Sequence, residues 1–239
     1  MRVAQEPAFV LHHTDYSETS LLLEVFTRAH GKLALLAKGG RRPKSPLRTT
    51  LIPFQPLAIT FAGRGEVPVL TSAEPAGVAP ELPGSLMVCG LYLNELLQRL
   101  LHRHDPHERL FDHYAQALEQ LAASAAPEPV LRVFEKRLLE EIGYGLVLDH
   151  EAGSGGTIDP AARYRYLADH GPVPYTPTGE GIVVQGETLR ALATEELAGE
   201  THLHEAKQLL RALLARQLGD RPLASRELLR AARPRHALE

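Results

Sequence analysis

Cysteine and tryptophan are almost missing from this sequence of 239 residues, which contains one cysteine, Cys89, and no tryptophan. A single thiol excludes an internal disulfide and any zinc site built on two or more thiolates. Apolar runs are short as well, and the longest, such as residues 33–37, are far below the ~18 residues that span a bilayer. The first residues contain Glu6 and Pro7, where a secretory signal needs an apolar core. We therefore expect a cytoplasmic protein without membrane contact.

The common sequence signatures of catalysis are also missing. The chain has no G-x-x-x-x-G-K-[ST] phosphate loop, and Ser154 lies between two glycines without the spacing of a hydrolase nucleophile elbow. Cys89 falls in an apolar helical stretch, which is typical of a core cysteine. No pair of acid and base stands at a characteristic spacing. We predict a protein that is not an enzyme and binds no cofactor.

Histidines are concentrated at His102, His104 and His107, with His113 further along. On a continuous helix the first two would point about 200° apart, so they could not bind one metal ion unless the helix had ended. We favour a helix end that is rich in histidine and predict no bound metal. A metal-dependent hydrolase stays open as a further functional class, and loss of an activity with a chelator would reveal it.

Acidic residues are absent between Glu24 and Glu66, although the same stretch contains eight lysines and arginines. The imbalance extends along the chain: residues 1–80 have a net charge of +3, residues 81–200 of −10 and residues 201–239 of +4. Such a division indicates different partners for different regions. A basic end favours contact with a polyanion, and an acidic middle region either repels that polyanion or contacts another protein.

Residues 38–48 form the strongest candidate site, because this segment combines glycine and proline with five basic side chains. Lysine and arginine neutralise phosphates and release counterions, which gives nucleic-acid binding without sequence preference. The alternative is a solvated basic loop. Of the nearby aromatic residues, Phe26, Phe54 and Phe61 are expected in the core, whereas Tyr16 lies in a polar turn and is free to stack on a base. The predicted DNA-binding residues are Tyr16, Arg28, Lys32, Lys38, Arg41, Arg42, Lys44 and Arg48.

Short apolar runs separated by turn residues predict strands in the first 75 residues, at 9–11, 21–26, 33–37, 57–61 and 67–70. Five strands at this spacing suit a small closed barrel, in which prolines 53, 56 and 68 mark edges or bulges. The proline-rich segment 73–83 is the expected domain boundary, which gives domains of residues 1–80 and 81–239. Beyond it the apolar period predicts helices at about 86–101, 110–122, 131–142, 202–218 and 225–232. Residues 150–181 are rich in glycine and proline and are predicted to be loops.

A series of short strings lies in order along nearly the whole chain. In the first third these are AFVLH at 8–12, YSETSL at 16–21, VFT at 25–27, AKG at 37–39, PFQPL at 53–57 and GRGE at 63–66. Further along they are GLYLNEL at 90–96, PEP at 127–129, RVFE at 132–135, GYG at 143–145, YRY at 164–166 and SREL at 225–228. Each string alone is weak, but the ordered set resembles the RecO family of bacterial DNA repair and recombination mediator proteins, and most closely its gammaproteobacterial branch.

This resemblance implies an α+β chain with an N-terminal five-stranded OB-fold barrel, followed by a helical domain with an irregular, loop-rich insertion. It also implies binding of single- and double-stranded DNA, annealing of complementary strands, and help in loading RecA recombinase onto DNA coated by single-strand binding protein. The implied location is the cytoplasm at the nucleoid. Many relatives carry a four-cysteine zinc module at the position of residues 150–181. No cysteine occurs there in this chain, so metal binding does not carry over.

The implied partners are RecR, RecA at loading intermediates, and the acidic, apolar C-terminal tail of single-strand binding protein. A receptor for that tail needs a cation beside an apolar groove. In the acidic helical region we predict that Arg132 binds the tail carboxylate beside Leu96 and Leu100. The alternative is a surface ion pair of Arg132 with Glu128 or Glu135. A second reading of the whole chain also stays open, namely a noncatalytic protein adaptor in which the basic segment does not contact DNA.

Overall fold

The computed structural model describes residues 2–124 and 126–231, and within them the chain forms two compact units. The first unit combines residues up to Ser124 with the segment after Pro222, and the second runs from residue 126 to Arg221. The change from strand to helix falls between Pro75 and Ser85, close to the expected boundary. Two long helices nevertheless belong to the same unit as the barrel, and the division into domains 1–80 and 81–239 stays a prediction.

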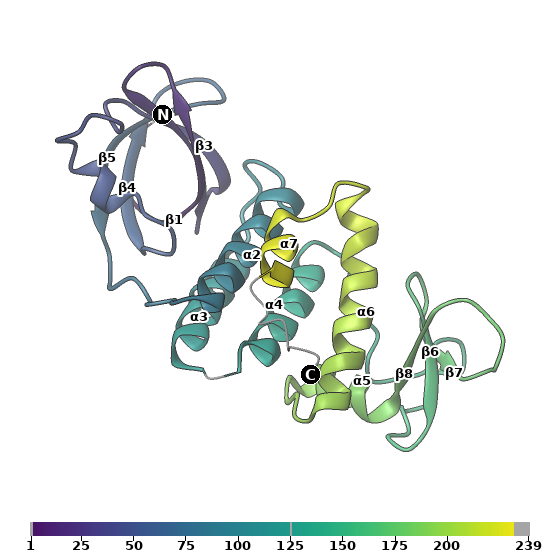
Figure 1. Cartoon of the computed structure of the whole chain (residues 1–239). Coiled ribbons are helices and arrows are strands. Elements are labelled where there is room, and N and C mark those ends of the chain that lie inside the picture. Colours follow the sequence, from purple (N-terminus) through teal and green to yellow (C-terminus); the bar gives the residue numbers. More distant parts are fainter. Residues whose placement is uncertain (1, 125, 232–239) are drawn as a thin grey trace, which may run out of the picture. The chain divides into compact units, whose positions relative to one another are not determined.

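The first unit begins with five strands that close into a barrel (Figure 1): β1 (Arg2–Tyr16), β2 (Ser20–Thr27), β3 (Gly31–Ala37), β4 (Leu57–Ala62) and β5 (Val69–Pro75). Neighbours in the barrel follow the order β1-β2-β3-β5-β4, and β4 pairs back with β1. Only the contact between β3 and β5 is parallel. The predicted five-stranded, OB-like barrel is thus confirmed. The strand predicted at 9–11 is much longer, because polar residues on its exposed face continue it in both directions.

Side-chain alternation along the strands produces two separate packing surfaces in the first unit. Inward-facing residues such as Val10, Leu23 and Val25 fill the barrel. Between them, Phe9 points outward, and its ring centroid lies 5.3 Å from that of Phe111 and 5.0 Å from that of Tyr114. The barrel is therefore fixed to the helices by an aromatic cluster as well as by the chain itself.

Besides the four-residue helix α1 (Leu47–Thr50), the described part of the first unit contains three longer helices: α2 (Ser85–Leu100), α3 (Glu108–Ala123) and α7 (Ala224–Ala231). The helices predicted at 86–101 and 110–122 are confirmed. The helix predicted at 225–232 is present as α7, and its last expected residue, 232, lies outside the described part of the chain. Glu95 of α2 accepts hydrogen bonds from the first backbone N–H groups of α7, at Ala224 and Ser225, each at 2.9 Å.

The second unit contains α4 (Pro127–Glu141), α5 (Gly186–Thr194) and α6 (Glu200–Leu218), together with a three-stranded sheet. The sheet has the order β7-β6-β8, from β6 (Arg163–Leu167), β7 (Gly171–Pro174) and β8 (Ile182–Gln185) (Figure 1). The prediction of loops throughout 150–181 is therefore wrong for this part. Buried tyrosines hold the chain there: the hydroxyl of Tyr164 accepts the N–H of Asp159 at 2.9 Å, and that of Tyr166 accepts the N–H of Val147 at 3.1 Å.

Candidate nucleic-acid interface

The basic segment, residues 38–48, leaves the end of β3 through a tight turn. Gly39 has a φ of +72°, a conformation that favours glycine, and the N–H of Gly40 donates to the carbonyl of Ala37 at 3.3 Å. A Cβ added to Gly40 would lie 3.0 Å from the side chain of Leu21. The two glycines therefore press the start of the basic segment closely against the barrel wall.

Arg41 fastens this turn to the neighbouring β1–β2 hairpin. Its guanidinium lies 2.8 Å from a carboxylate oxygen of Asp15 and donates to the carbonyl of Ser17 at 2.8 Å, and its backbone N–H donates to the carbonyl of Thr19 at 2.9 Å. Asp15 thus neutralises one of the five cations of the basic segment. Sequence reasoning missed this clamp, although Asp15 is one of only two acids in the turn that the arginine faces.

A short helix that the sequence did not predict, α1 (Leu47–Thr50), anchors the other end of the basic segment. Leu51, directly after it, is 5% exposed and belongs to the barrel core, and Leu47 packs against that core. A hollow of about 420 Å³ lies at the base of the segment and is lined by residues that include His13, Arg41 and Arg48. The segment is therefore braced at both ends, which reduces the entropy that a ligand must remove on binding.

Four of the predicted cations, Lys38, Arg42, Lys44 and Arg48, are exposed on the braced segment. Within residues 2–124 and 126–231, no carboxylate forms an ion pair with any of them. Tyr16 ends β1, is 52% exposed, and stands at the hairpin that Arg41 clamps. Exposed cations beside an exposed aromatic ring are the combination that single-stranded nucleic acid binds.

Two other predicted DNA contacts are already occupied. Arg28 binds α3: its guanidinium nitrogens lie 2.7 Å from an oxygen of Glu108 and 3.0 Å from an oxygen of Asp112. The hydrogen bond from Arg28 lowers the pKa of the Asp112 carboxyl. Lys32 is 8% exposed and donates from Nζ to the carbonyl of Gln98; burial lowers its pKa. Since neither side chain presents a free charge to solvent, we do not include Arg28 and Lys32 among the proposed contacts.

The structure shows where the aromatic residues and histidines singled out in the sequence lie. Phe26, Phe54 and Phe61 are all at most 5% exposed, so the prediction that they belong to the core is confirmed. α2 ends at Leu100, which places His102 and its neighbours in a connecting loop instead of a helix. Among the described residues, no three histidine, cysteine, aspartate or glutamate side chains gather in a way that could hold a metal ion.

None of the described helices has the length and apolar character needed to cross a membrane.

Arg132, predicted to bind a peptide carboxylate, is buried in α4. The residue is 2% exposed, and its Nη2 lies 2.6 Å from an oxygen of Glu135, which is also buried. The alternative partner Glu128 binds Lys207 instead, at 2.5 Å. Nε and Nη1 of Arg132 are buried and find no hydrogen-bond partner among the described residues. The ion pair weighed as an alternative is therefore present, but it is buried and leaves two donors unsatisfied.

The two leucines predicted beside Arg132 are also buried, with Leu96 0% and Leu100 9% exposed. Both belong to α2, in the first unit, whereas α4 belongs to the second. The groove that was predicted to combine them with Arg132 stays a prediction.

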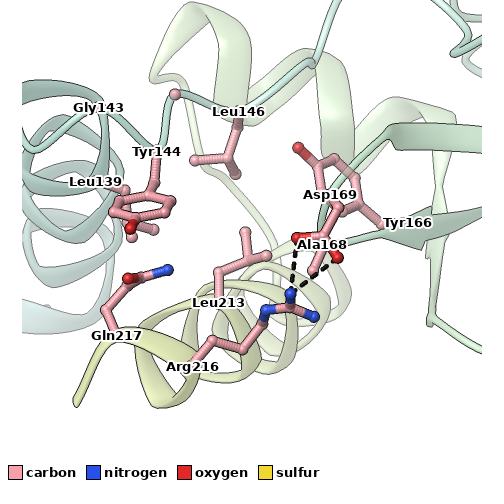
Figure 2. A pocket seen from close by; sticks show the side chains of 11 residues that line it. Leu139, Gly143, Tyr144, Leu146, Tyr166, Ala168, Asp169, Leu213, Arg216 and Gln217 are labelled. Atoms are coloured by element: carbon pink, nitrogen blue, oxygen red, sulfur yellow. Dashed lines mark hydrogen bonds and ion pairs between the residues drawn. The ribbon is translucent and has the colours of Figure 1, made fainter. Parts of the chain in front are cut away.

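The second unit has its own pocket of about 260 Å³ between the ends of α4 and α6 (Figure 2). Its apolar lining includes Leu139 and Leu213, and Tyr144, which is 55% exposed, stands at its edge. Arg216 is part of the lining, but its Nη2 donates to both carboxylate oxygens of Asp169, at 2.7 and 2.8 Å. The exposed lining of this pocket is thus mostly polar, and its arginine is already neutralised by Asp169.

The sequence of this chain matches one family of known proteins along almost its whole length. Residues 1–78 match the family model "Recombination protein O N terminal", and residues 84–227 match "Recombination protein O C terminal". The chain is 47% identical over 234 residues to a DNA repair protein RecO of Nitrosococcus oceani, with 98% of this chain and 95% of the relative covered. It is 46% identical over 230 residues to one of Aromatoleum aromaticum, with 96% of each chain covered. It is 47% identical over 231 residues to one of Methylococcus capsulatus, with 97% and 95% covered. Full-length matches at this identity mean that the chain belongs to the RecO family of DNA repair proteins, a family of recombination mediators.

Proposed function

We propose that this chain binds DNA through the basic segment of its barrel, anneals complementary strands, and helps to load RecA recombinase onto DNA coated by single-strand binding protein. The observation that carries the proposal is the set of four exposed cations on a segment braced at both ends, next to exposed Tyr16; none of the four forms an ion pair with another described residue. A rigid array of this kind matches a phosphate backbone without loss of much conformational entropy.

Annealing requires two polyanions to approach each other. Cations that bind phosphates on one strand lower its charge density, so the second strand meets less repulsion. Stacking of a base on Tyr16 would keep bases of the first strand accessible for pairing. None of these steps breaks a covalent bond, in agreement with a family of generally noncatalytic mediators.

The test uses the full chain with Arg42, Lys44 and Arg48 all changed to Gln. Each lost phosphate contact should lower the salt dependence of binding to single-stranded DNA by about 0.7, so the slope of log K against log salt should fall by about 2. Arg190, exposed in the second unit, offers the charge control as Arg190→Gln. An unchanged slope in the triple variant would remove the basic segment from the DNA site and favour the protein adaptor.

We further propose that Arg132 receives the terminal carboxylate of the tail of single-strand binding protein. Support comes from Nε and Nη1 of Arg132, two buried donors that find no acceptor in the part of the chain that the structure describes, since buried donors of this kind are normally satisfied. Interaction with RecR is proposed from family membership alone and has no assigned residues.

Replacement of Arg132 by alanine would remove the cation that faces the buried carboxylate of Glu135, so the informative change is Arg132→Lys, which keeps the charge. A tail peptide should bind this variant more weakly by roughly 1.5–3 kcal/mol, the scale of a hydrogen bond to a charged group. Affinity for bare DNA should stay the same. Normal peptide binding by a variant with unchanged melting temperature would remove Arg132 from the peptide site.

A further inference from the structure

The small sheet of the second unit has one buried face and one solvent-facing face. Tyr164, Tyr166 and Val184 are at most 4% exposed and form the buried face. Because side chains alternate along a strand, Arg163 and Arg165 of β6 point to the opposite face. Tyr175, directly after β7, follows on this face, since its N–H donates to the carbonyl of Arg163 at 3.0 Å. The solvent-facing side of the sheet therefore has two arginines and one tyrosine.

These three side chains form a compact group, the Arg-Tyr-Arg platform (Arg163, Tyr175 and Arg165). The Cζ atom of Arg163 lies 4.6 Å from the ring centroid of Tyr175, and that of Arg165 lies 5.4 Å from it. Tyr175 is 37% exposed even with both arginines beside it. A ring with two guanidinium groups this close presents an aromatic surface with positive charge beside it.

The two arginines have different roles in the platform. Arg165 donates to the carbonyl of Thr176 at 2.9 Å and to that of Pro177 at 3.2 Å, so it fixes the loop after β7. Arg163 is exposed, and within the described residues its guanidinium forms no hydrogen bond or ion pair. Arg165 is thus a positioning residue, and Arg163 has all of its donors available for a ligand.

The local charge favours an anionic ligand. Residues 160–185 contain two acids, Asp169 and Glu180. Asp169 binds Arg216 and is neutralised, and Glu180 is the remaining negative charge in the segment. Val173 and Val183 lie beside Arg165 in the sheet register and are only partly buried, which adds apolar surface next to the charge. Cations, an aromatic ring and apolar surface on one open sheet face are what nucleotide bases and their phosphates contact together.

We propose that the Arg-Tyr-Arg platform is a second contact for single-stranded DNA, in which a base stacks on Tyr175 and Arg163 binds a neighbouring phosphate. This inference rests on the proposed annealing function. A protein that pairs two strands has use for two contacts, and the basic segment of the barrel supplies one of them. The platform supplies the other, from a separate compact unit.

Photocrosslinking tests the proposal on the full chain. A single-stranded oligonucleotide containing 5-iodouracil crosslinks to aromatic side chains on which its bases stack, and the modified peptides are then identified by mass spectrometry. We expect crosslinks at Tyr16 and at Tyr175. Arg163→Gln should reduce the Tyr175 crosslink and the rate of annealing about fivefold or more, in line with the loss of one phosphate contact and its stacking geometry. Arg190→Gln removes one charge from the same unit and should change neither.

The outcomes separate this inference from the proposed function. Crosslinks confined to the barrel, with a normal annealing rate for Arg163→Gln and for Tyr175→Leu, would overturn the platform and leave the barrel site intact. Crosslinks at neither tyrosine, together with no binding of the oligonucleotide, would overturn the proposed function itself. An equal loss of annealing rate in Arg163→Gln and in Arg190→Gln would mean that net charge acts here without a specific site. This result too would overturn the platform.

Discussion

Replacement of Asp15 by asparagine should strengthen DNA binding, because it releases a cation that the protein itself neutralises. In the native chain a guanidinium nitrogen of Arg41 lies 2.8 Å from an oxygen of Asp15. The turn should keep its shape in the variant, since Arg41 also donates to the carbonyl of Ser17 and its N–H donates to that of Thr19. Both partners of the pair are partly exposed, so its loss should cost well under about 1 kcal/mol of stability.

The size of the effect follows from counterion release. One additional phosphate contact raises the salt slope for single strands by about 0.7. At 0.1 M salt, one decade below the 1 M reference, this corresponds to about a fivefold gain in affinity. Fluorescence anisotropy of a labelled oligonucleotide, titrated at several salt concentrations, measures both quantities.

Two controls make this result specific to the pair. Glu18→Gln removes an exposed acid from the same turn without releasing an arginine. It should change the slope of log K against log salt less than Asp15→Asn does. In an Arg41→Gln background, Asp15→Asn should lose most of its effect, because the released charge is no longer there. A slope and affinity equal to those of the native chain in Asp15→Asn would refute the idea that Arg41 can reach phosphate.

Three further predictions concern the scaffold. The Glu95 carboxylate accepts hydrogen bonds from Ser225. Burial raises the pKa of Glu95, but the hydrogen bonds together lower it more, so the pKa of Glu95 lies below its ordinary value. The stabilisation is present above about pH 4.5 and is lost as pH falls through the lower folded pKa, so the melting temperature should fall more steeply in acid for the native chain than for Glu95→Gln. Gly31→Ala should destabilise the first unit by at least about 2 kcal/mol in denaturant unfolding, since Gly31 has a φ of +67° and a Cβ would lie 2.0 Å from the carbonyl oxygen of Asp105. Elemental analysis of the purified chain should find far less than one zinc per molecule, and a value close to one would restore the histidine loop as a metal site.

The barrel and the long helices were predictable because their signals are local. Apolar runs divided by glycine turns marked the strands, and apolar periodicity marked the helices. The small sheet was missed because its short strands lie among many glycines and prolines. Its signal was present in the alternation of Tyr164, Arg165 and Tyr166, and in the β-branched run that begins at Ile182.

The composition of the candidate site was predictable, but the pairing of its charges was not. The acid-free stretch pointed to the basic segment, yet Arg28 is neutralised by Glu108 and Asp112, which are 80 and 84 residues away in sequence. Lys32 donates to the carbonyl of Gln98, 66 residues away. Pairings over such distances depend on how α2 and α3 pack against the barrel, which charge and spacing alone do not specify. Arg132 and Glu135, three residues apart, could be paired from the sequence, although their burial could not.

The proposed annealing function of the basic segment can be measured on complementary strands coated with single-strand binding protein. The comparison is between the native chain and a variant with Lys38, Arg42, Lys44 and Arg48 all changed to Gln, with equal melting temperatures as the condition for comparison. We expect the native chain to accelerate annealing and the variant to lose most of this acceleration. Equal acceleration by both proteins, or none by the native chain, would contradict it.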